Sequence, residues 1–328
     1  MQAAYYERTG PAREVLHVAE LPEPEPGPGE VRVRLRWSGV NPSDVKSRAG
    51  LRSTVLPFPR IVPHSDGMGL IDAVGAGVPP GRVGERVWLW NAAWGRAHGT
   101  AAQRIVLPQQ QAVPLPEGVP DEAGACLGIP AMTALHALLC AGGVAGQTVL
   151  VAGGAGAVGH YAVQMARLLG AARVLATAST PAKAAAARAA GADAVVDYRQ
   201  GDAAAQLKAA AGTTGIHRIV EVDIAANAAL DLDVLRPGGD CVVYGSGAPA
   251  FTLPFFPLIA RNLALRFFIV YNLEPADRQR AQATLGGWLE RGALVHAIGE
   301  RWPLAQVAQA HESVESGRAV GNVVLSLE

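Results

Sequence analysis

The chain has 328 residues, half of them hydrophobic, and its 28 Lys and Arg side chains balance 28 Asp and Glu side chains. This length allows two domains with a sizeable buried core. Without a basic excess the chain has little with which to neutralise nucleic-acid phosphates, so we expect no nucleic-acid partner.

The three cysteines, Cys126, Cys140 and Cys241, lie far apart and show no CxxC spacing. Disulfide frameworks, Fe–S clusters and zinc ribbons need more cysteines than this, so we expect buried thiols in a reducing compartment. The N-terminal residues lack the basic start and apolar run of a signal peptide. No stretch reaches the roughly 18 uninterrupted apolar residues of a membrane span. We therefore expect a cytoplasmic protein with no membrane partner.

The first third of the chain has the pattern of strands and turns. Residues 30–37 alternate polar and apolar, which predicts a half-buried strand. The preceding residues 22–29 contain four prolines and two glycines and predict a rigid surface connection. Further strand-like runs at 69–74 and 86–90 are separated by Gly and Pro. This part is expected to be a small, irregular β-domain.

From about residue 121, Ala-rich helical segments alternate with short apolar strands. Such alternation indicates parallel βαβ units and hence an α/β fold with a doubly wound sheet. The predicted strands are 148–152, 173–177, 194–196, 217–222, 240–244 and 264–270. The predicted helices between them are 160–169, 181–190, 203–210 and 225–235. The tail from about residue 275 predicts two more helices and a last strand, 321–327.

Gly154, Gly156 and Gly159 match the pattern G-x-G-x-x-G directly after the first of these strands. The match is meaningful because it follows a buried strand and opens an apolar helix. We expect Gly154 to permit the tight turn, Gly156 to let the backbone approach a pyrophosphate, and Gly159 to let helix and strand pack closely. The helix N-terminus would offer N–H groups and a positive dipole end to the phosphates. A glycine-rich turn without a ligand is the competing interpretation.

The residues after the second predicted strand favour NADPH over NADH. An NAD site needs a carboxylate about 20 residues beyond the glycine loop to hold the ribose 2′-hydroxyl. This chain has Ser179 and Thr180 there, then Lys183, and no acid before Asp193. Neutral donors with a cation suit a 2′-phosphate. Taken alone, Lys183 is equally consistent with a solvated helix lysine.

Three sequence blocks accompany the glycine loop: Asn-Pro-Ser-Asp at 41–44, Pro-His-Ser-Asp-Gly-Met-Gly at 63–69 and Gly-Ala-Gly-Val at 75–78. In order and spacing, these blocks resemble the medium-chain dehydrogenase/reductase superfamily along nearly the whole chain. They most resemble its zinc-free quinone oxidoreductase, or ζ-crystallin-like, branch. The resemblance implies a GroES-like, mostly β catalytic domain from 1–121 and 272–328, and a Rossmann dinucleotide-binding domain from 122–271. It also implies a homodimer.

The resemblance also implies which residues form the cofactor site. It implies that Asn41 lies near the nicotinamide, and that Asn322 stands where relatives often carry a lysine near the phosphates. That departure removes a positive charge and weakens the argument for NADPH. The expected cofactor-binding residues are Asn41, Thr133, Gly154, Ala155, Gly156, Ala157, Val158, Ser179, Lys183, Tyr198, Gly245, Phe268, Val270 and Asn322.

Zinc-dependent members of the superfamily hold their catalytic metal with Cys, His and Cys. The corresponding positions of this chain are Asn41, Ser65 and Ile129, and none supplies a thiolate or an imidazole. His64 and Asp66 would give only two ligands, with no obvious third. We therefore expect no metal, and we expect His64 to be a cleft or surface histidine where relatives usually have glycine.

Without zinc as a Lewis acid, the substrates that remain are those that accept hydride readily, namely quinones and conjugated enones or enals. The developing phenolate or enolate needs hydrogen-bond donors and a proton source. Asn41, Lys46 and the cofactor's ribose hydroxyl are the candidate donors, although Lys46 is equally consistent with a solvated lysine. Asp44 is expected to shape the loop through turn hydrogen bonds.

The substrate pocket is less defined by the sequence. Trp88, Trp90 and Trp94 form an aromatic patch that would either line a pocket for a ring or belong to the core or a lid. No tyrosine follows the 41–44 block, where related quinone reductases often carry one, and this raises the enone alternative. Three functions stay open: an NADPH:quinone reductase, an enone or enal reductase, and a non-catalytic NADPH-binding protein. The apolar 240–271 region is a candidate dimer edge.

Overall fold

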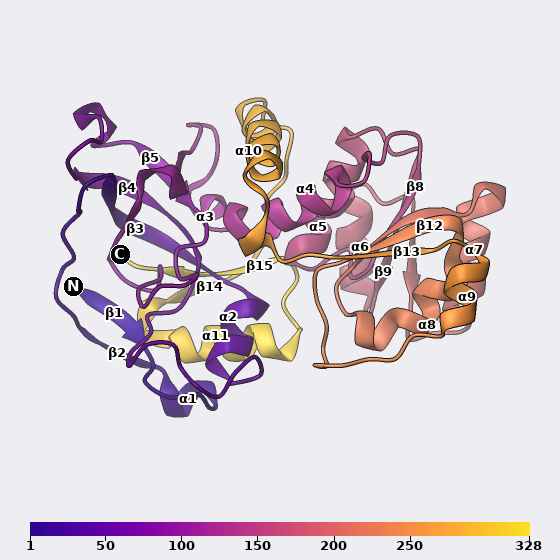
Figure 1. Cartoon of the computed structure of the whole chain (residues 1–328), viewed down its shortest axis with the longest axis horizontal. Helices are drawn as coiled ribbons and strands as arrows, with labels where there is room; N and C mark the ends of the chain where they lie inside the picture. Colours follow the sequence, from indigo (N-terminus) through magenta and orange to yellow (C-terminus); the bar gives the residue numbers. More distant parts are fainter. The chain divides into compact units, whose positions relative to one another are not determined.

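The computed structural model of the protein describes residues 1–328, which divide into two compact units (Figure 1). Unit 1 comprises Met1–Pro130 and Gly286–Glu328, and unit 2 comprises Ala131–Leu285. Unit 1 therefore combines the N-terminal part of the chain with its C-terminal tail. The domain limits expected from the sequence, at 121/122 and 271/272, stay a prediction.

Unit 1 is built on a seven-stranded, mainly antiparallel sheet with the order β14-β15-β3-β4-β5-β7, in which β6 also pairs with β3. A separate two-stranded sheet joins β1 and β2. The strands are β1 (Gln2–Tyr5), β2 (His17–Glu20), β3 (Glu30–Val40), β4 (Asp66–Val74), β5 (Arg86–Leu89), β6 (Arg104–Pro108), β7 (Ala112–Pro114), β14 (Ile298–Pro303) and β15 (Asn322–Ser326). The helices are α1 (Ala12–Val15), α2 (Pro42–Arg48), η1 (Pro80–Arg82), η2 (Gln109–Gln111), α3 (Asp121–Gly124), η6 (Leu304–Gln306) and α11 (Val307–Ser316), with η3 (Leu127–Ala131) at the unit boundary.

The alternating polar and apolar residues of β3 are alternately less and more buried in the structure. Val31, Val33 and Leu35 are each at most 2 % exposed and point into the core of unit 1. The residues between them, Arg32 and Arg34, lie on the other face of the strand, because successive side chains of a strand alternate. Burying each apolar side chain of this size contributes about 1.5–3 kcal/mol.

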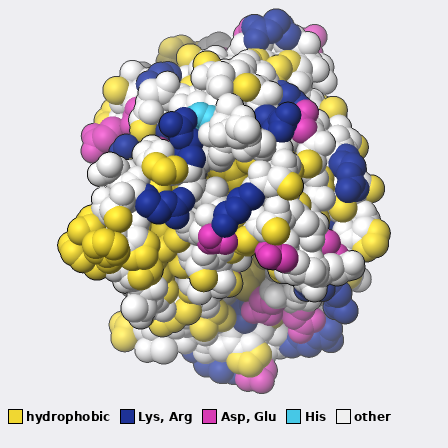
Figure 2. Space-filling model, turned by 90° about the vertical axis from the view of Figure 1, so that its right-hand side faces the viewer, with side chains coloured by type: hydrophobic (Ala, Val, Ile, Leu, Met, Phe, Trp, Pro, Cys, Tyr) yellow, Lys and Arg dark blue, Asp and Glu magenta, His cyan; other side chains and the backbone are white.

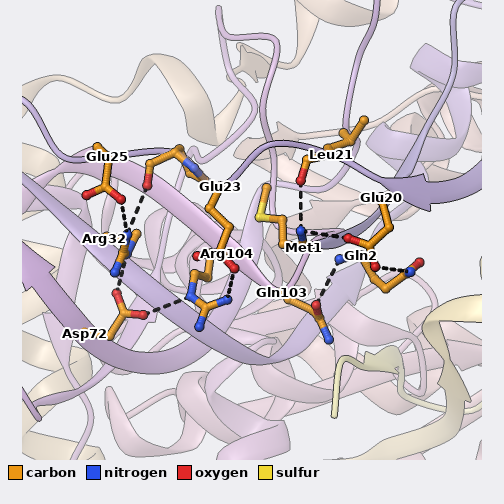
Figure 3. Close-up of polar contacts among 11 residues, drawn as sticks. Met1, Gln2, Glu20, Leu21, Glu23, Glu25, Arg32, Asp72, Gln103 and Arg104 are labelled. Atoms are coloured by element: carbon orange, nitrogen blue, oxygen red, sulfur yellow. Dashed lines mark hydrogen bonds and ion pairs between the residues drawn. The ribbon is translucent and has the colours of Figure 1, made fainter.

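Ion pairs fix the proline-rich segment before β3 to the sheet (Figure 3). The Arg32 side chain lies 2.7 Å from Glu25 and 2.8 Å from Asp72. Arg104 of β6 lies 3.1 Å from the same Asp72 and 2.7 Å from Glu23. Because the glutamates are largely exposed, each of those pairs contributes less than about 1 kcal/mol. Asp72 nevertheless holds Arg32 and Arg104 together, and these two arginines join their strands to the glutamates of a segment that has no regular structure of its own.

Unit 2 is a six-stranded, wholly parallel sheet with the order β10-β9-β8-β11-β12-β13. In chain order this is 3-2-1-4-5-6, the doubly wound arrangement, and the winding direction switches between β8 and β11. The strands are β8 (Thr148–Val151), β9 (Arg173–Ala178), β10 (Ala194–Asp197), β11 (Ile216–Glu221), β12 (Leu235–Val243) and β13 (Ala264–Phe267). The helices are α4 (Met132–Leu139), α5 (Ala157–Leu168), α6 (Pro181–Ala189), α7 (Ala203–Ala211), η4 (Gly212–Thr214), α8 (Ile224–Val234), α9 (Phe255–Ala260) and η5 (Val270–Asn272), with α10 (Pro275–Glu290) crossing the unit boundary.

The predicted fold class is confirmed: a doubly wound parallel sheet accompanies a mostly β unit. Several strand limits were wrong: β3 continues to Val40 rather than ending at residue 37, and β4 begins at Asp66 rather than at residue 69. β12 begins at Leu235 rather than at residue 240, and β13 ends at Phe267, three residues before η5 begins at Val270. Five short strands were not predicted, namely β1, β2, β6, β7 and β14, nor were the helices α1, α2, α3 and α9. None of the helices has the length and apolar character needed to cross a bilayer.

Candidate active site

The loop between β8 and α5 carries the predicted glycine pattern. Helix α5 begins after Gly156, which is extended at φ −76° and ψ 173°. A Cβ atom on Gly156 would meet only the carbonyl oxygen of Gly153, at 3.3 Å, so the space beside this residue is otherwise open within 4 Å. The first N–H groups of a helix have no carbonyl partner within it and carry its positive dipole end. Ala157 and Val158, in this first turn, therefore present a surface suited to an anion such as a pyrophosphate.

The tight turn depends on Gly153 rather than on Gly154, which corrects the role expected for Gly154. Gly153 has a φ of +66°, a left-handed value that favours glycine. A Cβ on Gly154 would lie 2.6 Å from the Cβ of Ala176 in β9, so Gly154 is needed for close packing. Gly159 has the expected packing role, because its Cβ would lie 2.2 Å from the Gly153 carbonyl oxygen.

Thr177, at the end of β9, holds the glycine loop and was missed as a functional residue. Its Oγ1 accepts a 3.0 Å hydrogen bond from the backbone nitrogen of Gly153. Its carbonyl oxygen accepts another, also 3.0 Å, from the nitrogen of Gly154. A hydroxyl residue next to the end of the second strand was the only sequence signal for this contact. Ala155, within the loop, is buried.

Ser179 and Tyr198 follow two neighbouring strands at the same edge of the sheet. β9 and β10 are in register so that Ala178 lies opposite Asp197, which places the next residue of each strand side by side. The Tyr198 nitrogen donates to the Ala178 carbonyl at 3.3 Å, and its side chain is 47 % exposed. Lys183 lies in the first turn of α6. Three of the residues expected to bind the cofactor, Ser179, Lys183 and Tyr198, therefore occupy one region of unit 2.

The side chains of Thr180 and Asp197, at the same edge of the sheet, already form hydrogen bonds within the protein. The Thr180 hydroxyl caps α6 by accepting a 3.2 Å hydrogen bond from the backbone nitrogen of Lys183. The Asp197 carboxylate accepts hydrogen bonds from the Arg199 backbone and the Gln200 side chain, each at 3.0 Å. Asp197 therefore directs both oxygens at its own loop.

Gly245, Phe268 and Val270 follow β12 and β13, whose carboxyl ends lie at the same sheet edge as the glycine loop. A Cβ on Gly245 would lie 2.2 Å from the Val222 carbonyl oxygen, so the chain passes too closely there for a side chain. The ring of Phe268 lies 4.6 Å from that of His136 in α4, the helix that also carries the buried Thr133.

Val270, one of the residues expected to bind the cofactor, is buried. Its carbonyl oxygen accepts a 2.7 Å hydrogen bond from the Arg278 side chain. That carbonyl is therefore engaged within unit 2.

In unit 1, the N-terminus of α2 brings Asn41 together with two acidic residues. The Asn41 side-chain nitrogen donates to Oδ2 of Asp66 at 2.9 Å. The Asn41 backbone nitrogen donates to Oδ2 of Asp44 at 2.8 Å, which closes the first turn of α2 and confirms that Asp44 shapes this loop. All three side chains are buried. Asp66 was treated only as a weak metal-ligand candidate, and its contact with Asn41 was missed.

Burial raises the pKa of both carboxyl groups. The pKa of Asp44 is raised to about 7 by burial, against hydrogen bonds from Asn41 that lower it. The pKa of Asp66 is raised well above its usual value, first by burial and further by the negative charge of Asp44, although the Asn41 amide opposes the shift. Burial therefore favours the neutral, protonated form of both carboxyl groups.

The three positions that correspond to zinc ligands in relatives lie around Asp66. Asn41 donates to the Asp66 carboxyl, a backbone hydrogen bond from Ile129 also lowers the pKa of that group, and Ser65 is its chain neighbour. These positions supply an amide, an aliphatic side chain and a hydroxyl. No group of three or more His, Cys, Asp or Glu side chains in the chain is arranged to hold a metal ion.

His64 is fully buried, so its expected place in a cleft or on the surface was wrong. The reason is that its ring packs and hydrogen-bonds with His311, which is 247 residues away along the chain. Trp88 is likewise a core side chain of β5, 2 % exposed, and does not belong to an aromatic patch that lines a pocket. Trp94 is 42 % exposed.

The remaining predicted residues of unit 1 are Lys46, which is half-buried on α2, and Asn322, which is buried at the start of β15. The Asn322 side-chain nitrogen donates to the Ala297 carbonyl at 3.1 Å. The predicted site residues thus fall into two groups. Asn41, Lys46 and Asn322 belong to unit 1, and the others belong to unit 2.

Comparison with known proteins agrees with this fold. Residues 27–117 match the family model of the alcohol dehydrogenase GroES-like domain, and residues 157–285 match that of the zinc-binding dehydrogenases. The chain is thus a medium-chain dehydrogenase/reductase. A quinone oxidoreductase from Pongo abelii is 33 % identical over 295 residues, which cover 88 % of this chain and 86 % of that protein. The chain therefore belongs to the quinone oxidoreductase family of that superfamily.

Solved structures share the fold over the whole chain. An NAD-dependent alcohol dehydrogenase gives a TM-score of 0.91 at 31 % identity, with 100 % of both chains covered. The quinone oxidoreductase from Thermus thermophilus, whose structures include a complex with NADPH, gives a TM-score of 0.85 at 31 % identity, again with 100 % of both chains covered.

Proposed function

We propose that the chain is an NADPH-dependent quinone oxidoreductase that transfers hydride to a quinone without zinc. The observation that carries this proposal is the donor set around Asp66. Where zinc-dependent relatives place two thiolates and an imidazole, this chain places Asn41, Ser65 and Ile129. An amide, a hydroxyl and an aliphatic side chain do not form a zinc site.

The glycine loop supports a dinucleotide cofactor. The open space beside Gly156 and the N–H groups of Ala157 and Val158 fit a pyrophosphate at the start of α5. Ser179, Lys183 and Tyr198 would hold the 2′-phosphate of NADPH, because they supply two hydroxyls and a cation. The NADPH complex of the Thermus thermophilus relative is consistent with this cofactor. Thr133, Gly245, Phe268 and Val270 would face the nicotinamide half, and Asn322 of unit 1 would lie toward the phosphates.

NADPH supplies the hydride when it is bound, and one proton must also reach the substrate to give the hydroquinone. The side chains of Asn41 and Lys46 are the donors proposed for the oxyanion that develops on the quinone. Asn41 suits this role because its amide is held on one side by Asp66 and its backbone by Asp44. A fixed donor does not need to reorganise during the reaction.

A fluorescence titration with NADPH and NADH, followed by turnover with 1,2-naphthoquinone and with 2-hexenal, tests the proposal. We expect tighter binding of NADPH and faster turnover of the quinone. Faster turnover of 2-hexenal would replace the quinone by an enone or enal as substrate. NADPH binding without consumption of either acceptor would instead indicate a non-catalytic binding protein. Equal or tighter NADH binding, as the NAD-dependent relative allows, would contradict the role given to Lys183.

We also propose a homodimer formed through unit 2. β13 is the edge strand of the parallel sheet, and its backbone is open to pairing on one side. Large apolar side chains are exposed nearby in the chain: Phe255 and Phe256 at 73 % and 72 %, Ile259 at 51 % and Phe267 at 58 %. Figure 2 shows apolar side chains gathered on the face of the molecule that carries unit 2. The cytoplasm is the proposed compartment, because all three cysteines are free thiols.

A further inference from the structure

His64 adopts a backbone conformation that favours glycine. Its φ of +76° is left-handed, and few residues with a bulky side chain adopt it without a compensating interaction. The side chain is fully buried, so solvent does not satisfy its ring nitrogens. The compensation must therefore come from the protein around it.

Both ring nitrogens of His64 have partners within unit 1. Nδ1 lies 2.9 Å from the Ser38 hydroxyl of β3, and Nε2 lies 2.9 Å from Nε2 of His311 on α11. The two imidazoles are also stacked, with centroids 5.1 Å apart. Ser38 continues the chain, because its Oγ lies 2.8 Å from Oγ1 of Thr100. Thr100 in turn donates to the backbone carbonyl of Asp66 at 2.5 Å.

The direction of every hydrogen bond in this chain follows from its last member. A carbonyl oxygen only accepts, so the single hydroxyl proton of Thr100 points at Asp66. Ser38 must then donate to Thr100, and His64 must donate to Ser38 through Nδ1. Burial lowers the pKa of His64 to about 3, so its ring is neutral and its Nε2 carries only a lone pair. His311 must therefore donate through its Nε2.

His311 completes the assignment. Its pKa is lowered well below the usual value by burial first, and then by His64 and Arg48, so it is neutral and its Nδ1 is bare. That Nδ1 has no hydrogen-bond partner in the structure. All hydrogen bonds of this chain of side chains thus point the same way. It begins at the unprotonated Nδ1 of His311 on α11 and ends at the backbone carbonyl of Asp66 at the start of β4.

The chain ends on the residue that holds Asn41. The carbonyl of Asp66 receives the last hydrogen bond, and the carboxyl of the same residue accepts from the Asn41 side chain at 2.9 Å. A backbone carbonyl does not pass a proton on, so the chain does not conduct protons to the site. It fixes the backbone of Asp66, the residue whose carboxyl group accepts from Asn41.

We propose that His64 and His311 are positioning residues that hold the Asn41 amide at its working position through Ser38, Thr100 and Asp66. The inference deepens the proposed function, since it assumes that Asn41 acts on the substrate or the nicotinamide. It explains why a left-handed position in unit 1 carries a histidine. Glycine would relieve the backbone strain there but would break the chain at its centre.

The test compares His311→Phe with the parent enzyme in steady-state turnover of 1,2-naphthoquinone. Phenylalanine retains the stacked ring but removes the hydrogen-bond donor. A small displacement of a positioned group is enough to cost up to about 100-fold in rate, so we expect kcat to fall at least about tenfold. The NADPH dissociation constant is expected to stay within about twofold, because the glycine loop belongs to unit 2. Val307→Ala is the matched control. It opens a cavity on the same helix but removes no member of the hydrogen-bond chain, so it should leave kcat unchanged.

A second measurement separates positioning from a general loss of stability. In an Asn41→Ala background, His311→Phe should change kcat by less than about twofold, because the group on which it acts is gone. The proposal would be overturned if His311→Phe lowered kcat equally in the Asn41→Ala background and in the parent. It would also be overturned if the single variant His311→Phe had a kcat within about twofold of the parent. His64→Asn serves if His311→Phe does not fold, since asparagine tolerates a left-handed φ.

A spectroscopic arm does not depend on turnover. Nitrogen-15 NMR should show neutral His64 protonated on Nδ1 and neutral His311 protonated on Nε2, and the Asn41 side-chain amide signals should shift in His311→Phe. The opposite tautomers, or unchanged Asn41 signals, would reject the positioning chain even in an active enzyme. If the parent protein turns over no acceptor but the NMR results are as expected, the proposed function is wrong and the hydrogen-bond chain from His311 to Asp66 is still supported.

Discussion

The side-chain nitrogen of Asn41 lies 2.9 Å from Oδ2 of Asp66, and both side chains are buried. Burial raises the pKa of Asp66, and in the protonated form that burial favours the carboxyl resembles a primary amide in shape and charge. Asp66→Asn should therefore change the free energy of unfolding by less than about 1 kcal/mol. Asp66→Ala should cost about 1–3 kcal/mol, since it leaves the Asn41 amide without its acceptor. Urea denaturation at pH 7 measures both, and equal losses in the two variants would mean that Asp66 is ionised.

Lys183 is the residue on which the proposed NADPH preference most depends. A hydrogen bond to a charged group contributes about 1.5–3 kcal/mol, so Lys183→Ala should weaken NADPH binding roughly tenfold or more. NADH binding should change little, because NADH lacks the 2′-phosphate. Fluorescence titration with both cofactors gives the two dissociation constants. Lys208→Ala is the matched control, since Lys208 lies on the next helix of the unit and pairs with Asp233 at 2.6 Å. A parallel loss for NADPH and NADH would remove Lys183 from the phosphate site.

The glycine loop offers a pair of variants with opposite consequences. Gly156→Val should keep the fold at a modest cost in stability, because a Cβ there meets only the Gly153 carbonyl oxygen, which must shift slightly from 3.3 Å. It should abolish NADPH binding, since the side chain occupies the space of the pyrophosphate. Gly154→Val should instead unfold or strongly destabilise unit 2, because its Cβ would lie 2.6 Å from Ala176. Circular dichroism melts and NADPH titration separate the two. A Gly156→Val protein that binds NADPH normally would show that the pyrophosphate lies elsewhere.

Sequence reasoning found the strands of the parallel sheet because they are short apolar runs, most of them next to an Ala-rich helix. It missed β1, β6 and β7, which have three to five residues each, because such short strands carry too few residues for a periodicity.

The candidate site was predicted where its residues are close in sequence, as in the glycine loop. Asn41 and Asp66 pair across 25 residues, and His64 and His311 across 247. Pairs of that kind depend on tertiary packing, which no local pattern records.

A buried acid pair in unit 2 predicts the dependence of stability on pH. The pKa of Asp231 is raised to about 9, first by burial and then by the negative charge of Glu221, whose own pKa is also raised by burial. The folded state thus keeps a proton that the unfolded state releases above about pH 4. The unfolding free energy should therefore fall as the pH rises from about 4 to 9, by up to about 1.4 kcal/mol per unit for one proton.

Asp231→Asn should remove most of that slope. Urea denaturation at pH 6, 7, 8 and 9 measures it in the parent and the variant. Asp233→Asn is the control, because Asp233 lies on the same helix but is largely exposed and paired with Lys208. A slope that is unchanged in Asp231→Asn would place the retained proton on another group.

Phe267 tests the proposed dimer. It is the last residue of the edge strand β13 and is 58 % exposed. If two copies pair along this edge, Phe267→Asp buries an unpaired charge in the interface and should weaken dimerisation at least about 100-fold. Light scattering after size exclusion should then give twice the 34.0 kDa chain mass for the parent and the chain mass for the variant at micromolar concentration. Leu51→Asp is the matched control, because Leu51 is an apolar side chain of unit 1 that is 71 % exposed. A Phe267→Asp protein that stays dimeric would place the interface away from β13.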